Sequence, residues 1–131
     1  MKRILLYVYV LCSVFLFCGC TVQDKEVKVG DYYMETDFDV PPCIMISEEQ
    51  IVFTYDFLSS KLTMGTYVVE GDVLTMTTYD GDGKYVFKIE KDSLIFQESK
   101  SSALTYVEKD PMIKVLDGAK FVLGEWEPES F

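Results

Sequence analysis

Histidine is absent from this 131-residue chain. Ser-His-Asp and Cys-His catalytic groups, His-containing zinc sites and the HExxH protease motif are therefore excluded. Glycine-rich phosphate loops are also missing, because the eight glycines are scattered among turn sequences. Acid–base chemistry would have to rest on paired carboxylates. We therefore expect a protein that is not an enzyme and that needs no cofactor or metal.

Basic residues are few, with 12 Lys and Arg against 22 Asp and Glu and a net charge of −10. Nucleic-acid recognition depends on Lys and Arg that neutralise phosphates, so this balance argues against nucleic acid as a partner. It also argues against electrostatic adhesion to an anionic membrane surface. A cationic protein is the partner that such a charge favours.

The first residues follow the order of an export signal. Lys2 and Arg3 precede an uncharged apolar run over Ile4–Phe17, and the small Gly19 stands just before Cys20. The run has 14 residues, which is short of the roughly 17–25 that a spanning helix needs. We expect an N-terminal signal helix, with an uncleaved membrane anchor as the alternative.

The pair Gly19-Cys20, followed by a switch to polar sequence, resembles the lipobox of bacterial lipoprotein signals. Phe17 and Cys18 depart from the usual lipobox residues. The resemblance implies cleavage before Cys20 and attachment of diacylglycerol and palmitate to this cysteine. It also implies that membrane lipid, through acylated Cys20, holds the protein on the extracytoplasmic face of the cell membrane.

Such processing leaves Cys43 as the one unmodified thiol, because Cys12 and Cys18 are removed with the signal. A framework of paired disulfides is then excluded. We expect Cys43 to be a small, buried side chain on a strand and not a reactive thiol. The mature chain would have 112 residues, with 10 basic and 22 acidic side chains and a net charge of −12.

Period-two alternation of apolar and polar residues recurs from Val27 onward, and helical periodicity is nearly absent. This pattern predicts an all-β domain. The stretch 65–99 predicts four strands joined by tight turns at 70–72, 80–83 and 91–92. Each turn contains Gly or Asp, which tolerate positive φ, and the strands are rich in Val, Tyr, Thr, Phe and Ile.

Two further hairpins are predicted. "CIMIS" and "IVFTYDF" flank "EEQ" over residues 43–57, and Asp117-Gly118 lies between two apolar runs over residues 112–123. The total of eight or nine short strands indicates a small antiparallel meander that forms a barrel or a strongly curled sheet, with a two-sheet sandwich as the competing architecture. We expect a packed interior, and a hollow that holds a small apolar ligand is the alternative.

Three short motifs resemble parts of metal-binding or catalytic sites, but none of them is complete. "DGDG" at 80–83 begins like a calcium loop, but Lys84 and Lys91 stand where the fifth and twelfth positions require ligands. A hairpin turn is the better interpretation. "DFD" at 37–39 has no further ligand nearby. "SKSS" at 99–102 pairs Ser with Lys, yet neighbouring residues of a strand point to opposite faces.

The longest connections of the chain, 58–64 and 99–111, are candidates for a binding site or a short helical turn. We expect the tail to dock on the domain or to be disordered, with a free tail that a partner recognises as the alternative. The expected segments are a signal peptide at 1–19, a lipidated tether at 20–27, a single β domain at 28–123 and an acidic C-terminal tail at 124–131.

Residues 65–96, with "SKSS" and "LDGAKF" after them, resemble small extracytoplasmic lipoproteins of low-GC Gram-positive bacteria. More loosely, they resemble lipocalin-like domains of bacterial lipoproteins, and the likeness covers roughly residues 40–123. It implies a β-barrel and supplies no catalytic residues. We expect a membrane-anchored, non-enzymatic binding or interaction module for a small apolar ligand or a cationic protein. The alternative function is inhibition or neutralisation of a cationic extracellular protein or peptide.

Overall fold

The computed structural model describes residues 25–59 and 62–124. The expected signal peptide at 1–19 and nearly all of the expected tail lie outside the described residues. Within them a single short 3-10 turn, η1 (Glu98–Lys100), accompanies eight strands. The strands are β1 (Gly30–Met34), β2 (Cys43–Ile46), β3 (Ile51–Thr54), β4 (Thr63–Glu70), β5 (Val73–Thr78), β6 (Lys84–Glu90), β7 (Ser93–Phe96) and β8 (Lys120–Leu123).

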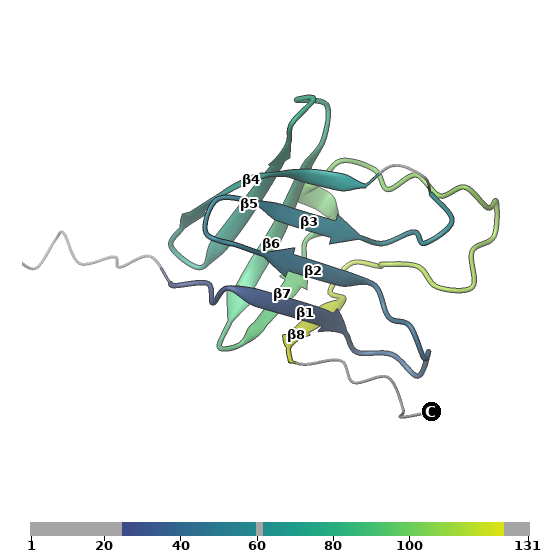
Figure 1. Cartoon of the computed structure of the whole chain (residues 1–131), viewed down its shortest axis with the longest axis horizontal. Helices are drawn as coiled ribbons and strands as arrows, with labels where there is room; N and C mark the ends of the chain where they lie inside the picture. The colour runs from purple at the N-terminus through teal and green to yellow at the C-terminus, as the bar shows by residue number, and fades with distance from the viewer. Residues whose placement is uncertain (1–24, 60–61, 125–131) are drawn as a thin grey trace, which may run out of the picture.

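Each strand pairs antiparallel with the next along the chain, and β8 pairs with β1, so the sheet closes into a barrel (Figure 1). The predicted all-β meander is confirmed, and it forms a barrel and not a two-sheet sandwich. Because the first strand, β1, pairs with the last, β8, no sheet edge is left exposed among these strands.

The tight turns that join β4, β5, β6 and β7 lie where the sequence predicts them. Positive φ values occur at Gly71 (62°), Gly81 (79°) and Lys91 (50°), one in each turn. Glycine reaches this conformation without the steric cost that a Cβ atom brings. The predicted β2–β3 hairpin is also confirmed, and the Ser47 amide donates to the Gln50 carbonyl across its turn at 2.9 Å.

The hairpin predicted around Asp117-Gly118 is wrong. Residues 112–116 form no strand, and the Gly118 amide instead donates to the Phe96 carbonyl at 2.9 Å. The cause lies in the closed sheet, because β8 already pairs with β7 on one side and β1 on the other. An additional strand beside β8 has no place, so this apolar run becomes a loop that buries Val115 against the core.

The barrel interior is filled with aromatic and aliphatic side chains. Phe53 lies at its centre, with ring centroids of Phe87, Tyr85 and Phe121 at 5.3, 5.6 and 5.9 Å. These separations are typical of packed aromatic pairs. The other fully buried large side chains include Tyr32, Ile44, Ile51, Leu74, Met76, Ile89, Leu94 and Phe96.

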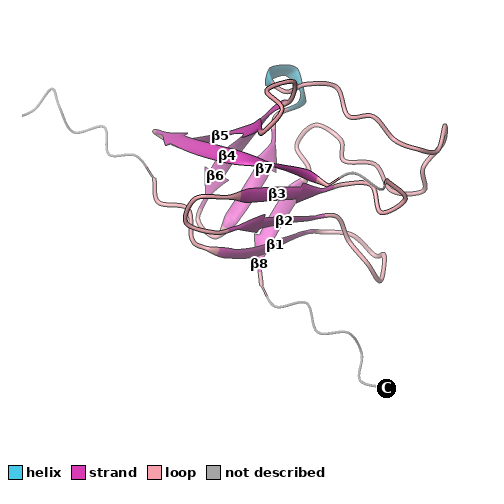
Figure 2. Ribbon diagram, turned by 45° about the horizontal axis from the view of Figure 1, so that its top comes forward, coloured by secondary structure: helices cyan, strands magenta, loops and turns pink. Residues whose placement is uncertain are grey.

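The two ends of the barrel differ in their connections. Because the strands alternate in direction, the three long connections and the β5–β6 turn lie at one end, the loop end, and the other three tight turns lie at the opposite end, the turn end (Figures 1 and 2). The described chain also begins at the turn end, where the Lys25 amide donates to the Gly71 carbonyl at 2.7 Å. The described residues of the loop end are 35–42, 55–59, 62, 79–83 and 97–119, and those of the turn end are 25–29, 47–50, 71–72 and 91–92.

Candidate functional site

Cys20, the predicted lipidation site, lies outside the described residues, as do Cys12 and Cys18. Lipidation therefore stays a prediction. In the part of the chain that the structure describes, no helix is long and apolar enough to cross a membrane.

Cys43 begins β2 and alternates with the buried Ile44, so its thiol lies on the outer wall of the barrel and is half-buried. Its position on a strand agrees with our expectation, but complete burial does not. Burial raises the pKa of the Cys43 thiol above its ordinary 9.0, a hydrogen bond with Thr54 lowers it, and the Asp31 carboxylate raises it again. A raised pKa leaves less thiolate, which argues against a nucleophilic role.

The "DGDG" motif forms the turn between β5 and β6. Asp80 Oδ1 accepts from the Asp82 amide at 2.9 Å, and the Gly83 amide donates to Thr78 Oγ1 at 2.9 Å. These contacts are those of a side-chain-stabilised turn. No group of three or more Cys, Asp or Glu side chains among the described residues could hold a metal ion.

The serines of "SKSS" hold the long 97–119 connection against β6. Ser102 Oγ accepts from the Lys84 amide at 3.0 Å, and Ser101 Oγ accepts from the Val86 amide at 2.8 Å. The Ser102 amide donates in return to the Lys84 carbonyl at 2.7 Å. Since β7 pairs only with the later part of β6, these hydroxyl groups satisfy amides that the sheet would leave open. Their role is structural.

Exposed large hydrophobic side chains gather at the loop end. Elsewhere on the described surface such side chains are Val29, Met45 and Val68. A concentration of this kind on one face marks binding surfaces. Those at the loop end are Phe38, Val40, Phe57, Leu58, Leu62, Tyr79, Val107, Met112 and Leu116.

Two clefts flank the extended segment Ser102–Tyr106 at this end. One, which we call the aromatic cleft, has a volume of about 510 Å³ and lies between the β3–β4 connection, the β5–β6 turn and Thr105. The other, the outer cleft, has a volume of about 440 Å³ and is lined by Leu104, Tyr106 and later residues of the same connection. Ser102 and Ala103 line both clefts, whereas Leu104 and Tyr106 line the outer cleft and Thr105 lines the aromatic cleft.

Tyr55 connects the core to both clefts, because its ring centroid lies 5.0 Å from Phe53, 6.4 Å from Tyr85 and 5.4 Å from Tyr106. Burial raises the pKa of Tyr85 to about 12, and its contact with Tyr55 and the Asp80 carboxylate act in the same direction. Burial also raises the pKa of Tyr106. Both phenols are therefore neutral near pH 7, so they offer hydrogen bonds and apolar surface and no base.

The described residues that line the two clefts differ in charge. The described residues that line the aromatic cleft include Asp80 and Asp82 and no basic side chain. The outer cleft combines Glu98 and Glu108 with two lysines, Lys109 and Lys114, so its charges balance. By sequence the four loop-end connections contain ten acidic and four basic residues, a net charge of −6.

Two aspartates fasten the long connections to each other and to the barrel. Asp56 Oδ2 accepts from the Val107 amide at 2.7 Å, which ties the β3–β4 connection to the 97–119 connection. Asp117 Oδ1 accepts from the Glu98 amide at 2.9 Å and joins the two ends of the 97–119 connection. The clefts are therefore bounded by segments that hydrogen bonds hold in place.

Comparison of the chain with models of known protein families, with curated proteins and with solved structures found no match. The structure itself defines a class of protein. It is a closed, eight-stranded, up-and-down β-barrel of lipocalin-like architecture, with a packed interior and two clefts at one end.

The connections 58–64 and 99–111 were candidates for a binding site or a short helical turn. Residues of both line the clefts, and η1 overlaps the start of the second connection, while a binding role stays a prediction. Tyr79, Asp80 and Tyr106 were not singled out as site residues. The sequence could have indicated Tyr79, because an aromatic side chain next to a turn is not needed for packing of the core.

Proposed function

We propose that this protein is an exported lipoprotein that uses the loop end of its barrel to bind a partner. In this proposal cleavage before Cys20 leaves a cysteine that carries diacylglycerol and palmitate, and the lipid holds the barrel on the extracytoplasmic face of the cell membrane. The activity is non-enzymatic binding. Support for the anchor comes from the signal-like order of the first twenty residues.

The observation that carries the binding function is the concentration of exposed apolar side chains around two clefts, at the end opposite the entry of the chain. The filled interior supports the same conclusion, because core side chains occupy the space that a central ligand would need. A small apolar ligand or a protein would therefore bind at the loop end.

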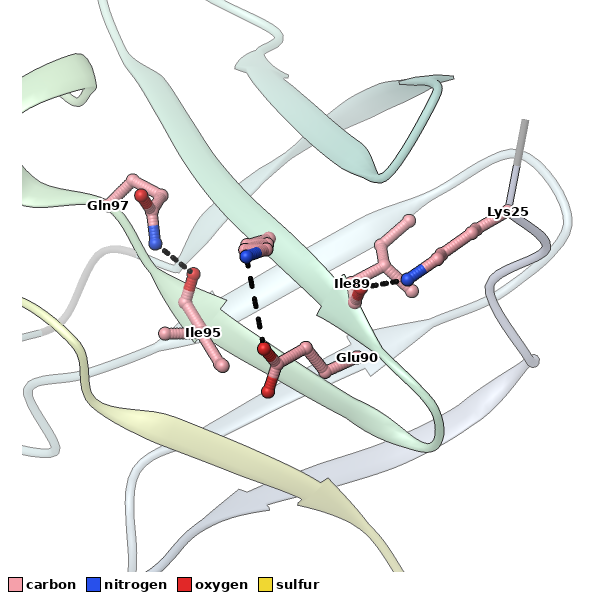
Figure 3. A network of polar contacts seen from close by, with 6 residues as sticks. Lys25, Ile89, Glu90, Ile95 and Gln97 are labelled. Atoms are coloured by element: carbon pink, nitrogen blue, oxygen red, sulfur yellow. Dashed lines mark hydrogen bonds and ion pairs between the residues drawn. The ribbon is translucent and has the colours of Figure 1, made fainter. Parts of the chain in front are cut away.

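The first described residues also bear on how the barrel would stand on the membrane. The Lys25 amide donates to Gly71, and Lys25 Nζ donates to the Ile89 carbonyl at 3.3 Å (Figure 3). Nearby, Lys28 Nζ and Asp92 form an exposed ion pair at 2.7 Å. Residues 25–28, expected to belong largely to a free tether, thus lie along the turn end. A lipid on Cys20 would place this end toward the membrane and the loop end away from it.

Metabolic labelling with a palmitate analogue tests the anchor. Label is expected on the wild-type chain and on Cys43→Ala, the matched control, and is expected to disappear in Cys20→Ala. Undiminished labelling of Cys20→Ala would overturn the proposed anchor. Photo-crosslinking residues placed at Leu62 and Leu116 should capture the same partner, whereas one at Val68 on the barrel wall should not.

The second candidate function is neutralisation of a cationic extracellular protein or peptide. The net charge of −6 at the loop end favours it, because opposite charge accelerates association. Association with such a partner should weaken as salt is added, since exposed charges are screened. Salt-insensitive association would remove the support for this candidate.

A further inference from the structure

We propose that the outer cleft binds a short free peptide with apolar side chains, whose terminal ammonium group meets Glu98 and whose terminal carboxylate meets Lys114. The bound molecule is a zwitterion, and its side chains pack against Leu104 and Tyr106. The inference rests on the proposed function, because it specifies the small ligand that the loop end would hold.

A single stretch of chain builds the outer cleft. Its described lining residues all belong to 96–116, a stretch that leaves β7, runs outward and turns back toward β8 (green to yellow in Figure 1). The volume of about 440 Å³ falls in the range of small-molecule pockets, roughly 300–1,000 Å³. A ligand of a few residues therefore suits the cleft better than a folded domain.

The outer cleft carries charges of both signs that do not pair with each other. Its lining includes two carboxylates and two ammonium groups, those of Glu98, Glu108, Lys109 and Lys114. The ion pairs of the described residues lie elsewhere, so here every carboxylate oxygen is more than 4.0 Å from every lysine nitrogen. Opposite charges that are held apart match a ligand that carries both signs, because each end of the ligand then gains a partner. A purely cationic or purely anionic ligand would use only one sign.

Tyr106 links the two charges to which we assign the ends of the ligand. Its hydroxyl accepts a hydrogen bond from the Val115 amide at 2.9 Å, so its ring lies beside the segment that carries Lys114. Burial raises the pKa of Tyr106, and the Glu98 carboxylate raises it further, which places that carboxylate near the phenol. Glu98 and Lys114 therefore line the cleft near the same aromatic ring.

Apolar side chains line the same cleft and explain why the ligand is more than a pair of charges. Leu104 and Tyr106 are half-buried, and Leu116 is 62% exposed. A ligand with apolar side chains would remove this surface from water. A zwitterion without apolar side chains would leave it hydrated and should bind more weakly.

Hydrogen bonds fix the start of the segment that forms the cleft. The Glu98 amide donates to Asp117 Oδ1 at 2.9 Å, which joins the two limbs of the connection. The Lys84 amide donates to Ser102 Oγ at 3.0 Å and fastens the first limb to β6. Because these contacts exist before a ligand arrives, less conformational freedom is lost when the complex forms.

The test uses the full chain in zwitterionic nanodiscs, with empty nanodiscs as the blank, and measures dissociation constants by isothermal titration calorimetry. The probes are leucyl-leucine with free termini, its N-acetyl derivative, which is an anion, and its C-terminal amide, which is a cation. The free dipeptide should bind about fourfold more tightly than either derivative, because each derivative loses one partly exposed ion pair.

Two variants test the assignment of the ends. Glu98→Gln should weaken binding of the free dipeptide about fourfold and remove its advantage over the N-acetyl derivative, because the ammonium group has lost its partner. Lys114→Gln should likewise remove its advantage over the amide. The matched controls, Asp110→Asn and Lys100→Gln, are exposed charges of the same connection outside the described lining. Each control should change binding less than about 1.5-fold, since solvent screens distant charges.

A fourth probe represents a polypeptide partner. It is a tetrapeptide with capped termini, in which two leucines lie between a lysine and a glutamate, so both charges stand on side chains. The free dipeptide should bind more tightly, because its charged groups lie closer to its apolar side chains. Equal or tighter binding of the capped probe would overturn the small ligand in favour of a polypeptide segment.

The remaining outcomes also decide the inference. Equal losses in the cleft variants and their controls would show that total charge governs binding and would overturn the assignment to this cleft. Equal binding of the free dipeptide and its two derivatives would overturn the zwitterionic ligand. Binding of none of the probes would overturn the inference as a whole. Crosslinking from Leu62 and Leu116 and labelling at Cys20 decide the proposed function independently of these results.

Discussion

Gly65 of β4 lies directly against Thr77 of β5. A Cβ atom on Gly65 would overlap the Thr77 carbonyl oxygen and come within 2.7 Å of its carbonyl carbon. Gly65 also pairs with Ile51 of β3, so backbone confines it on both sides. The absence of a side chain here allows three neighbouring strands to approach one another in a small closed barrel.

Gly65→Ala is therefore expected to destabilise the protein by about 3 kcal/mol or more, because backbone and not a flexible side chain occupies the space. Urea unfolding followed by circular dichroism measures this loss. Gly124→Ala is the matched control, since a Cβ atom there meets no atom within 4 Å. A change of less than about 1 kcal/mol in Gly65→Ala would contradict the close packing of β4 on β5.

Substitutions of Phe53 and Phe57 should have different effects on the free energy of unfolding. Phe53 is 1% exposed at the centre of the aromatic core, and Phe57 is 49% exposed at the loop end. Phe53→Ala should cost about 3–5 kcal/mol of unfolding free energy through lost burial and a cavity. Phe57→Ala should cost less than about 1 kcal/mol, because about half of Phe57 is already exposed to solvent and the variant leaves no enclosed cavity. Similar losses in the two variants would contradict this division.

The hairpins of β4 to β7 were predictable because local chemistry determines them. Gly71 and Gly81 supply positive φ at the turns, and strict alternation places Lys88 and Glu90 outside while Phe87 and Ile89 face the core. Each of these signals acts over a few residues. These local signals can be read from the sequence alone, because they do not depend on contacts with distant residues.

The failed hairpin and the clefts depend on contacts between distant residues. Asp117-Gly118 has a local hairpin signal, but β8 takes its partners from residues far away in the chain. The aromatic cleft likewise requires Tyr55, Asp80 and Thr105 to meet. Periodicity predicted the strands, but these three residues lie on the connections between them. Barrel closure, which periodicity does not encode, decides which connections come together.

Alkaline pH should reveal the environment of Tyr85. Its neutral form is favoured in the folded protein, where burial raises its pKa to about 12 from an ordinary value of 10.0. The stabilisation is fully present below pH 10 and is lost as pH rises from 10 to 12, on the order of 2 kcal/mol. Urea titrations across this range should show a smaller fall for Tyr85→Phe than for wild type. Tyr79→Phe should retain the wild-type fall, because Tyr85 is intact.

Cys43 should react slowly with thiol reagents. Burial raises the pKa of its thiol above 9.0, so little thiolate is present at neutral pH. The labelling rate of the processed protein should lie well below that of free cysteine at neutral pH and should rise as the medium becomes more alkaline. Cys43→Ala supplies the background rate. A neutral-pH rate equal to that of free cysteine would contradict the effect of burial.

Asp56 should control the order of the loop end. Its Oδ2 accepts from the Val107 amide at 2.7 Å across two connections, and its Oδ1 accepts from the Leu58 amide at 3.1 Å. Asp56→Ala removes both acceptors, so the Val107 amide should exchange with solvent about tenfold faster, which corresponds to the loss of one charge-assisted hydrogen bond. Amide hydrogen exchange resolved by residue measures this change. The exposed Asp110→Ala is the matched control for lost charge, and unchanged exchange at Val107 in Asp56→Ala would show that other contacts hold the long connection.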